Sequence, residues 1–227
     1  MNIFTKVYGL AQQTRYVQND VTGAGVVATP GRSGEGQAGG GACPTKGTCE
    51  VTLFEQRNFT GRRLDLSADC QKLSDKNFPE RCNSVQVESG AWVGYEHENF
   101  RGRQYLWDMS ERGEYNCYDK WCAQTEHVAS VRSVKQDTSP ARAHLFERPG
   151  FSGKKTELQD DIPNLMSRYS LNRVASIRIL GGAWVVYQEP NYRGPHYILE
   201  KRDYSNVSDW GSQSSTIGSM RRVRFIN

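Results

Sequence analysis

Cysteine and histidine are the side chains of this sequence with the widest chemical capacity, because thiolates and imidazoles bind transition metals and act as nucleophiles or bases. The 227-residue chain has six cysteines and four histidines. Cys117, Cys122 and His127 form a candidate metal-binding group, with four residues between each and the next. Zinc sites favour the shorter Cys-x-x-Cys spacing. The spacing therefore predicts free thiols on a strand or loop, and no metal site.

A catalytic site or a cofactor site is not indicated either. A hydrolytic site needs a base beside a nucleophile and an orienting acid, but the histidines are scattered along the chain at His97, His127, His144 and His196. Residues 34–39 match the glycine pattern of dinucleotide-binding folds, which requires a strand before it and a helix after it. Gly40-Gly41-Ala42-Cys43-Pro44 follows instead. We therefore expect a protein that is not an enzyme and has no catalytic residue and no cofactor.

The distribution of the cysteines predicts reduced thiols. All six lie in the N-terminal half, at Cys43, Cys49, Cys70, Cys82, Cys117 and Cys122. The first residues do not form a secretory signal peptide, and the chain lacks an apolar run of about 18 residues. We expect a cytoplasmic protein without disulfides and without a membrane partner. Cys43 and Cys49 lie in a flexible arm and are vulnerable to oxidation, and their role stays open.

The charge is spread too evenly to indicate a nucleic-acid partner. The net charge is +4, and after Cys49 there are 25 basic and 23 acidic residues. Nucleic-acid binders concentrate basic residues in a patch or stripe. Only Arg62-Arg63 and the run from Arg221 to Arg224 come close, and both lie in strand-like stretches whose alternation splits the charges between two faces. We expect no nucleic-acid binding.

One phrase occurs four times and organises the chain. It consists of an aromatic residue, four spacers, a second aromatic, one spacer and a glycine. The four copies are Phe54, Phe59 and Gly61; Tyr95, Phe100 and Gly102; Phe146, Phe151 and Gly153; and Tyr187, Tyr192 and Gly194. The glycines step by 41, 51 and 41 residues. A period of this length indicates a repeated supersecondary unit, and the longer middle step indicates two domains of two units each.

The ends of the repeats also match. A serine followed by an apolar residue lies 23, 28, 23 and 25 residues after the four glycines, at Ser84, Ser130, Ser176 and Ser219. The first and third repeats then run into Gly90-Ala91-Trp92 and Gly182-Ala183-Trp184. Odd and even repeats therefore differ, as expected if each domain has an ordered first and second motif.

The local pattern predicts an all-β fold with two β-sandwich domains. Residues 62–66, 85–87 and 177–179 alternate polar and apolar side chains, and turn residues recur every 8–12 positions. Only residues 204–210 and the region near Met166 indicate short helical turns. We expect a disordered, glycine-rich arm at 1–49, an N-terminal domain at 50–134, a linker at 135–142 and a C-terminal domain at 143–227.

These repeats resemble the βγ-crystallin family from about residue 50 to the end of the chain. The resemblance implies that each repeat is a four-stranded Greek key and that two keys form one sandwich. It assigns the four glycines to positive φ in a folded hairpin, the paired aromatics to packing over that hairpin, and the four serines to hydrogen bonds with its backbone. These roles are structural, with no catalytic and no metal-binding residue. The implied core aromatics are the paired residues of the phrase together with Trp92 and Trp184.

The long N-terminal arm resembles the β-crystallins more than the compact γ-crystallins. The absence of a C-terminal arm resembles the acidic β subgroup, but a pI of about 8.7 departs from that name, so the subgroup stays open. The β resemblance implies a homo-dimer or a hetero-oligomer with other β-crystallins. Whether the domains pair within one chain or swap between two, and how large the oligomer is, stays open as well.

Calcium is the main alternative ligand, because many relatives outside the lens bind it. Their loop has two Asn or Asp residues, two variable positions, Ser or Thr and the terminal serine, which supplies oxygen ligands to a hard cation. The corresponding windows here open with Pro79-Glu80, Thr125-Glu126, Leu171-Asn172 and Ser214-Ser215. None has the acidic or amide pair, so we expect no tight calcium site, while weak surface binding stays open.

The tryptophans indicate core packing and one exception. Trp92 corresponds to Trp184, and Trp121 corresponds to Trp210. Such matched placement is typical of buried aromatic residues. Trp107 has no counterpart in the second domain, so we expect it to be exposed or at an interface.

The sequence therefore predicts a structural constituent of the eye lens in the cytoplasm of the lens fibre cell. Its function would be to contribute refractive index and transparency as a stable, concentrated, soluble protein. Arginine outnumbers lysine by 20 to 9 and aromatic residues make up 11% of the chain, which favours polarizable side chains. The alternative is a non-lens βγ-crystallin-type binding or stress module with weak calcium binding.

Overall fold

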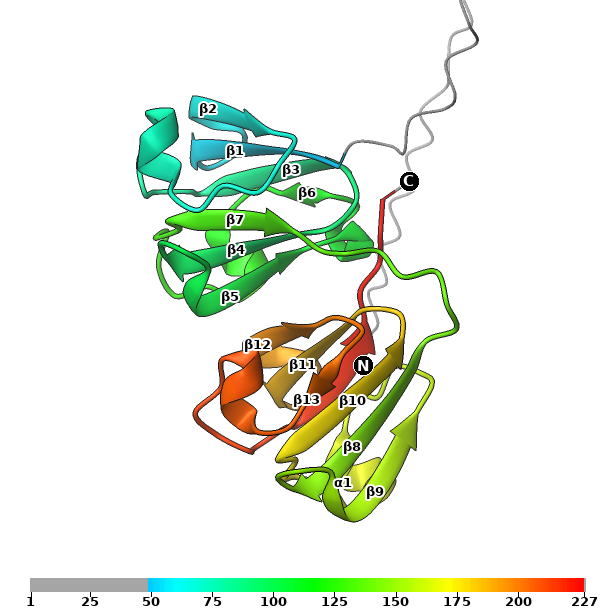
Figure 1. Cartoon of the computed structure of the whole chain (residues 1–227). Coiled ribbons are helices and arrows are strands. Elements are labelled where there is room, and N and C mark those ends of the chain that lie inside the picture. Colours follow the sequence, from blue (N-terminus) through cyan, green and yellow to red (C-terminus); the bar gives the residue numbers. More distant parts are fainter. Residues whose placement is uncertain (1–48, 227) are drawn as a thin grey trace, which may run out of the picture. The chain divides into compact units, whose positions relative to one another are not determined.

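Alternating apolar and polar residues fold into short antiparallel strands, which build two β-sandwiches in succession along the chain (Figure 1). The computed structural model describes residues 49–226. The arm expected at 1–49, with Cys43, therefore lies outside the described residues apart from Cys49. The prediction of an all-β chain with two β-sandwich domains is confirmed.

The N-terminal sandwich contains two sheets, with strand orders β2-β1-β3-β6 and β5-β4-β7. Its strands are β1 (Glu50–Gln56), β2 (Thr60–Leu66), β3 (Ser84–Ser89), β4 (Trp92–His97), β5 (Arg101–Trp107), β6 (Glu114–Tyr115) and β7 (Ser130–Ser133). Three 3-10 helices connect them, namely η1 (Leu73–Lys76), η2 (Met109–Glu111) and η3 (Tyr118–Trp121). Residues 134–141 then lead to the second sandwich without forming a helix or strand.

The C-terminal sandwich repeats this plan, with strand orders β13-β10-β8-β9 and β12-β11-β14. Its strands are β8 (Arg142–Arg148), β9 (Ser152–Leu158), β10 (Ser176–Gly181), β11 (Trp184–Glu189), β12 (Arg193–Leu199), β13 (Asp203–Tyr204) and β14 (Ser219–Arg222). Its helical turns are α1 (Leu165–Tyr169) and η4 (Val207–Trp210), which lie where the sequence indicated them. No helix within residues 49–226 has the length and apolar character needed to cross a bilayer.

The two repeats of each sandwich exchange strands. Strand β6 belongs to the second repeat but pairs with β3 of the first, with Tyr115 opposite Val85. In return, Cys70 of the first repeat forms an isolated bridge with Val131 of β7. In the C-terminal sandwich β13 pairs with β10, and Ile162 bridges Met220. Because neither repeat completes its own sheet, a pair of repeats is the smallest unit that contains both complete sheets.

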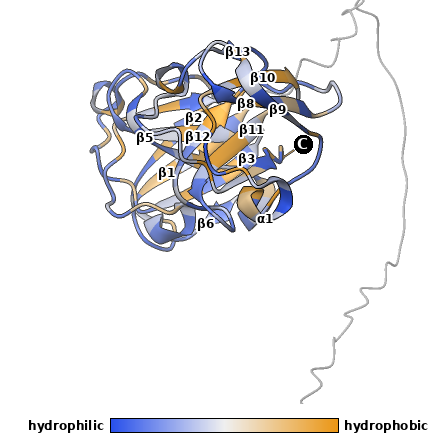
Figure 2. Cartoon of the chain, turned by 90° about the horizontal axis from the view of Figure 1, so that it is seen from below, coloured by the Kyte–Doolittle hydropathy of each residue, from blue (hydrophilic) through white to orange (hydrophobic). Residues whose placement is uncertain are grey.

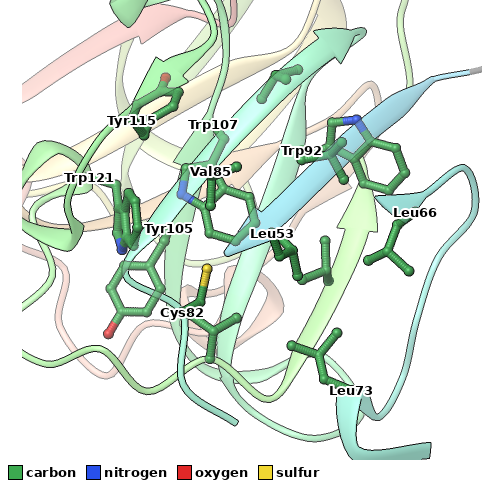
Figure 3. Close-up of a cluster of buried hydrophobic side chains, with 14 of the residues drawn as sticks. Leu53, Leu66, Leu73, Cys82, Val85, Trp92, Tyr105, Trp107, Tyr115 and Trp121 are labelled. Atoms are coloured by element: carbon green, nitrogen blue, oxygen red, sulfur yellow. The ribbon is translucent and has the colours of Figure 1, made fainter. Parts of the chain in front are cut away.

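Each sandwich has its own apolar core between its two sheets. In Figure 2 hydrophobic residues are concentrated on central strands such as β11, and much of the surrounding loop structure is hydrophilic. The side chains of Leu53, Val85 and Trp92 are fully buried in the N-terminal core (Figure 3). The five cysteines of the described range are free thiols, so no disulfide among them crosslinks these cores.

The expectation that Trp107 is exposed or at an interface is wrong. Trp107 is fully buried in the N-terminal core and packs edge to face on Trp121, with ring centroids 5.5 Å apart (Figure 3). Its place is opened by Gly94 on the neighbouring strand, because a Cβ at that position would lie 2.4 Å from Trp107 Cη2. In the second sandwich the equivalent pair is Val186 and Leu199, both buried. A small and a large residue thus replace two residues of intermediate size.

This compensation predicts strong coupling between the two positions. Gly94→Val should destabilise the N-terminal sandwich by about 1–3 kcal/mol through overpacking. Trp107→Leu should cost about 2–4 kcal/mol by leaving a cavity. The double variant recreates the Val186 and Leu199 combination and should cost less than the sum by at least about 1 kcal/mol. Chemical denaturation of the four proteins measures this difference.

The matched control combines Gly94→Val with Ile179→Val, a substitution in the other core. These two positions share no contact, so their effects should add to within about 0.5 kcal/mol. Equal additivity for the Gly94 and Trp107 pair would contradict the proposed compensation.

Candidate functional site

The four aromatic–glycine phrases form four folded hairpins with left-handed backbone. The glycines have φ of +80°, +82°, +80° and +80° at Gly61, Gly102, Gly153 and Gly194. The second aromatic of each phrase also has a φ of about +60°, namely Phe59, Phe100, Phe151 and Tyr192. Left-handed backbone costs a residue with a side chain roughly 1–2 kcal/mol. The hairpins therefore need stabilisation from outside the phrase.

A buried serine supplies that stabilisation in every repeat. The serine Oγ accepts the N–H of the second aromatic at 2.9, 3.0, 2.9 and 2.9 Å in Ser84, Ser130, Ser176 and Ser219 respectively. The same hydroxyls donate to a hairpin carbonyl at 2.5, 2.6, 2.6 and 2.6 Å, in Gln56, His97, Arg148 and Glu189. All four serines have no exposed surface. Each hydroxyl thus satisfies a donor and an acceptor that would otherwise be unpaired.

The two aromatics of each phrase pack against each other over the hairpin. Their ring centroids lie 5.7, 5.7, 5.8 and 5.8 Å apart in the pairs Phe54–Phe59, Tyr95–Phe100, Phe146–Phe151 and Tyr187–Tyr192. The first aromatic of each pair is buried. The left-handed conformation of the second aromatic was not foreseen from the sequence. A signal for it exists, because Asn or Gly, which tolerate this conformation, precede it at Asn58, Asn99, Gly150 and Asn191.

The two entry tryptophans occupy the same position in both sandwiches. Trp92 and Trp184 are fully buried. Their indole N–H groups donate to the carbonyls of Ser89 at 3.2 Å and Gly181 at 3.1 Å. Since each indole is buried and hydrogen-bonded to the residue three positions before it, these tryptophans have a packing role in the structure.

A third apolar cluster joins the two sandwiches. It contains Ala91, Val93, Tyr95, Leu106 and Val134 from the N-terminal side and Ala183, Val185, Tyr187, Ile198 and Val223 from the C-terminal side. At its edge, Gln104 Oε1 accepts the N–H of Ile198 at 2.9 Å, and His196 Nε2 accepts the N–H of Leu106 at 3.2 Å. The two sandwiches therefore contact each other through equivalent strands, β5 and β12, with reciprocal bonds. Sequence reasoning did not find this set.

Two ion pairs flank the cluster in the same reciprocal way. Arg132 of β7 donates to Tyr95 of its own sandwich at 2.8 Å and to Glu200 of the other at 2.7 Å. On the opposite side, Arg221 of β14 donates to Tyr187 at 3.3 Å and to Asp108 at 2.8 Å.

The carboxylate of the second pair is well compensated despite having no exposed surface. Burial opposes its ionisation, but Arg221, Ser110 and the Arg224 N–H outweigh that cost, so the pKa of Asp108 lies below its usual value. Removing one partner of such a pair leaves a buried charge without compensation.

The loops that correspond to the calcium windows are occupied by protein groups in the N-terminal sandwich. Arg81 Nε lies 2.7 Å from Glu126 Oε1, and Asn83 donates to Glu126 Oε2 at 2.9 Å. His127 Nε2 lies 3.7 Å from Glu80 Oε2. The Glu126 oxygens, which a calcium ion would need as ligands, are thus bonded to Arg81 and Asn83, and the positive charge of Arg81 would repel the ion.

The candidate group of Cys117, Cys122 and His127 is not assembled as a metal site. Cys117 and Cys122 flank η3, and the backbone of His127 forms an isolated antiparallel β-bridge with that of Arg81. Across residues 49–226, no three side chains of His, Cys, Asp or Glu are grouped to hold a metal ion.

Comparison with known proteins places these features in context. The Beta/Gamma crystallin family model matches residues 50–134 and 142–223. Gamma-crystallin N-A of Danio rerio is 43% identical over 176 residues, covering 77% of this chain and 94% of that protein. Gamma-crystallin B of Bos taurus is 38% identical over 174 residues, covering 77% and 97%. Beta-crystallin B2 of Aquarana catesbeiana is 41% identical over 178 residues, covering 77% and 85%.

The hairpin serines yield a direct test. Ser176→Ala leaves the Phe151 N–H and the Arg148 carbonyl unpaired in a buried site, so we expect a loss of about 2–3 kcal/mol in the free energy of unfolding. Ser167→Ala, on the exposed side of α1, is the matched control and should change it by less than about 0.5 kcal/mol. Urea denaturation measures both. Equal effects would show that the serine bridge does not stabilise the hairpin.

Proposed function

The chain belongs to the beta/gamma crystallin family, and on that premise we propose that it is a structural constituent of the eye lens. In this role it contributes refractive index and transparency as a stable and concentrated soluble protein in the cytoplasm of lens fibre cells. The relatives named above are crystallins, and they match most of the chain. The proposal adds the tissue and the optical role to that family membership.

The observation that carries the proposal is that buried polar side chains of the two sandwiches form structural contacts. The four buried serines hold hairpins, and the two inter-sandwich ion pairs hold the apolar cluster between the sandwiches. These groups are therefore committed to stability. A protein that is not replaced during the life of a cell depends on slow unfolding, which such buried and satisfied contacts provide.

Composition supports the optical part of the proposal. Arginine outnumbers lysine by 20 to 9, and aromatic residues make up 11% of the chain. Guanidinium and aromatic groups have delocalised electrons, which are more polarizable than those of aliphatic groups of similar mass. Such side chains raise the refractive index per unit mass of protein.

We also propose that the chain associates as a homo-dimer or as a hetero-oligomer with β-crystallins. The reciprocal contacts between β5 and β12 show that equivalent faces of two sandwiches fit each other. Faces of this kind can pair between chains in place of pairing within one chain, because a closed two-fold contact uses the same patch on both partners.

The proposed function predicts the distribution of the protein among tissues. Quantitative mass spectrometry of lens extract should rank it among the abundant proteins, and extracts of other tissues should contain far less. If the protein is scarce in lens and present elsewhere, the lens function is rejected. Calcium titration of its melting temperature would then test the alternative, a non-lens binding module.

The proposed association predicts a particle larger than one chain of 25.7 kDa. Sedimentation velocity should show at least a dimer whose population grows with protein concentration, because association follows mass action. A single monomeric species at every concentration, alone and mixed with β-crystallins, would reject the association and leave the lens function standing.

A further inference from the structure

The edges of β5 and β12 are closed by side chains from the opposite sandwich. Both strands lie at the edge of their sheets, where unpaired N–H groups are a liability. His196 Nε2 accepts the Leu106 N–H, and Gln104 Oε1 accepts the Ile198 N–H. Gln104 and His196 occupy equivalent positions, opposite Tyr95 and Tyr187 respectively. One of the two equivalent acceptors can therefore gain a proton in mild acid, and the other cannot.

The contacts of His196 define its protonation state. Nδ1 lies 3.2 Å from the Gly194 carbonyl, so it carries the hydrogen, and Nε2 is the free acceptor for Leu106. A proton added to Nε2 would place one N–H group against another. The bond between the sandwiches cannot survive that change, since an imidazolium has no acceptor nitrogen.

The surroundings of His196 disfavour addition of a second proton to its ring. The side chain is 4% exposed, and its ring lies 5.0 Å from that of Tyr187 and 6.5 Å from that of Tyr105. The pKa of His196 is lowered to about 4, mainly by burial and in smaller part by Arg221, while the hydrogen bond with Gly194 and the charge of Asp108 act in the opposite direction.

Two cavities of about 120 and 260 Å³ adjoin the ring. Besides Arg221, the titratable and charged groups that line them are Arg103, Glu111, Lys120, Cys122, Glu189 and Arg224, with the tyrosines Tyr105, Tyr115, Tyr187, Tyr192 and Tyr197. The tyrosines and the thiol are neutral in mild acid. The two carboxylates among these groups belong to Glu111 and Glu189, and neither is bonded to the His196 ring, whose hydrogen-bond partners are Leu106 and Gly194.

We propose that His196 makes the contact between the two sandwiches sensitive to acid, because its protonation breaks the Leu106 hydrogen bond and favours separation of β5 from β12. The equivalent Gln104 keeps the other half of the contact independent of pH.

The direction of the pH effect follows from the two states of the imidazole. When the sandwiches separate, His196 meets water and regains its usual pKa of about 6.5. The separated form then binds more protons than the paired form between pH 6.5 and pH 4, so pairing is stable above this window and weakens as pH falls through it. Asp108 keeps its charge at pH 5 because its pKa is lowered. The ion pair between Asp108 and Arg221 is therefore retained at pH 5.

The test is hydrogen exchange of the Leu106 amide in the full chain, followed by NMR at pH 7 and pH 5. After correction for the intrinsic exchange rate, the opening constant should rise about 20-fold at pH 5, as two-state linkage between pKa values of about 6.5 and 4 requires. An opening constant that stays the same at both pH values overturns the proposal.

The matched variant is His196→Gln, which copies Gln104 and supplies an acceptor that does not titrate. Its opening constant should change by less than about threefold between the two pH values. The exposed residue His97 provides the control, because His97→Gln should keep the full response of the unmodified protein. A response retained in His196→Gln, or lost in His97→Gln, overturns the assignment to His196.

A further readout does not depend on how the variants fold. In the unmodified chain, the NMR titration of the His196 ring should have its midpoint well below the usual histidine value of about 6.5. A midpoint at or above pH 6 would show that the ring titrates freely and would overturn the proposal.

The reverse variant Gln104→His should add a second acid-sensitive bond and make the exchange of the Ile198 amide rise in acid as well.

Discussion

The left-handed backbone of the four hairpins is the constraint on which the rest of the structure depends. It lets each hairpin fold over its own aromatic pair, and a serine from outside the hairpin bonds one N–H and one carbonyl of it. The serines that bond these groups are the first residues of β3, β7, β10 and β14. Hairpin and final strand of each repeat therefore stabilise each other, and strand exchange extends this dependence to the whole sandwich.

Repetition of one unit also explains the contact between the sandwiches. Equivalent strands meet, so the edge hydrogen bonds and the flanking ion pairs each have a counterpart formed by equivalent residues. The counterparts are not chemically identical, since Gln104 corresponds to His196 and Asp108 corresponds to Glu200. Substitutions at equivalent positions change the response of the contact to pH while the backbone arrangement is kept. Equivalent core positions also differ in side-chain size while the backbone arrangement is kept, with Gly94 and Trp107 in one sandwich and Val186 and Leu199 in the other.

Several polar side chains that form short ion pairs and hydrogen bonds hold parts of the structure together. Arg132 and Arg221 each bond a tyrosine of their own sandwich and a carboxylate of the other, and Glu126 is held by Arg81 and Asn83. Such pairs are costly to break one partner at a time. A molecule organised in this way suits a function that depends on remaining folded at high concentration, which is the function proposed for it.

The sequence by itself determined the repeat, the all-β class and the pairing of repeats into two sandwiches, because spacing and alternation are local properties that any copy of the unit must preserve. It also singled out the glycines, aromatics and serines of the phrase. Tertiary structure alone decided that Trp107 is buried, since its space comes from Gly94 on another strand. It also decided which N–H group His196 accepts and which carboxylate Arg221 meets. These partners are 90 and 113 residues apart in the chain, and no local pattern encodes a contact over such a separation.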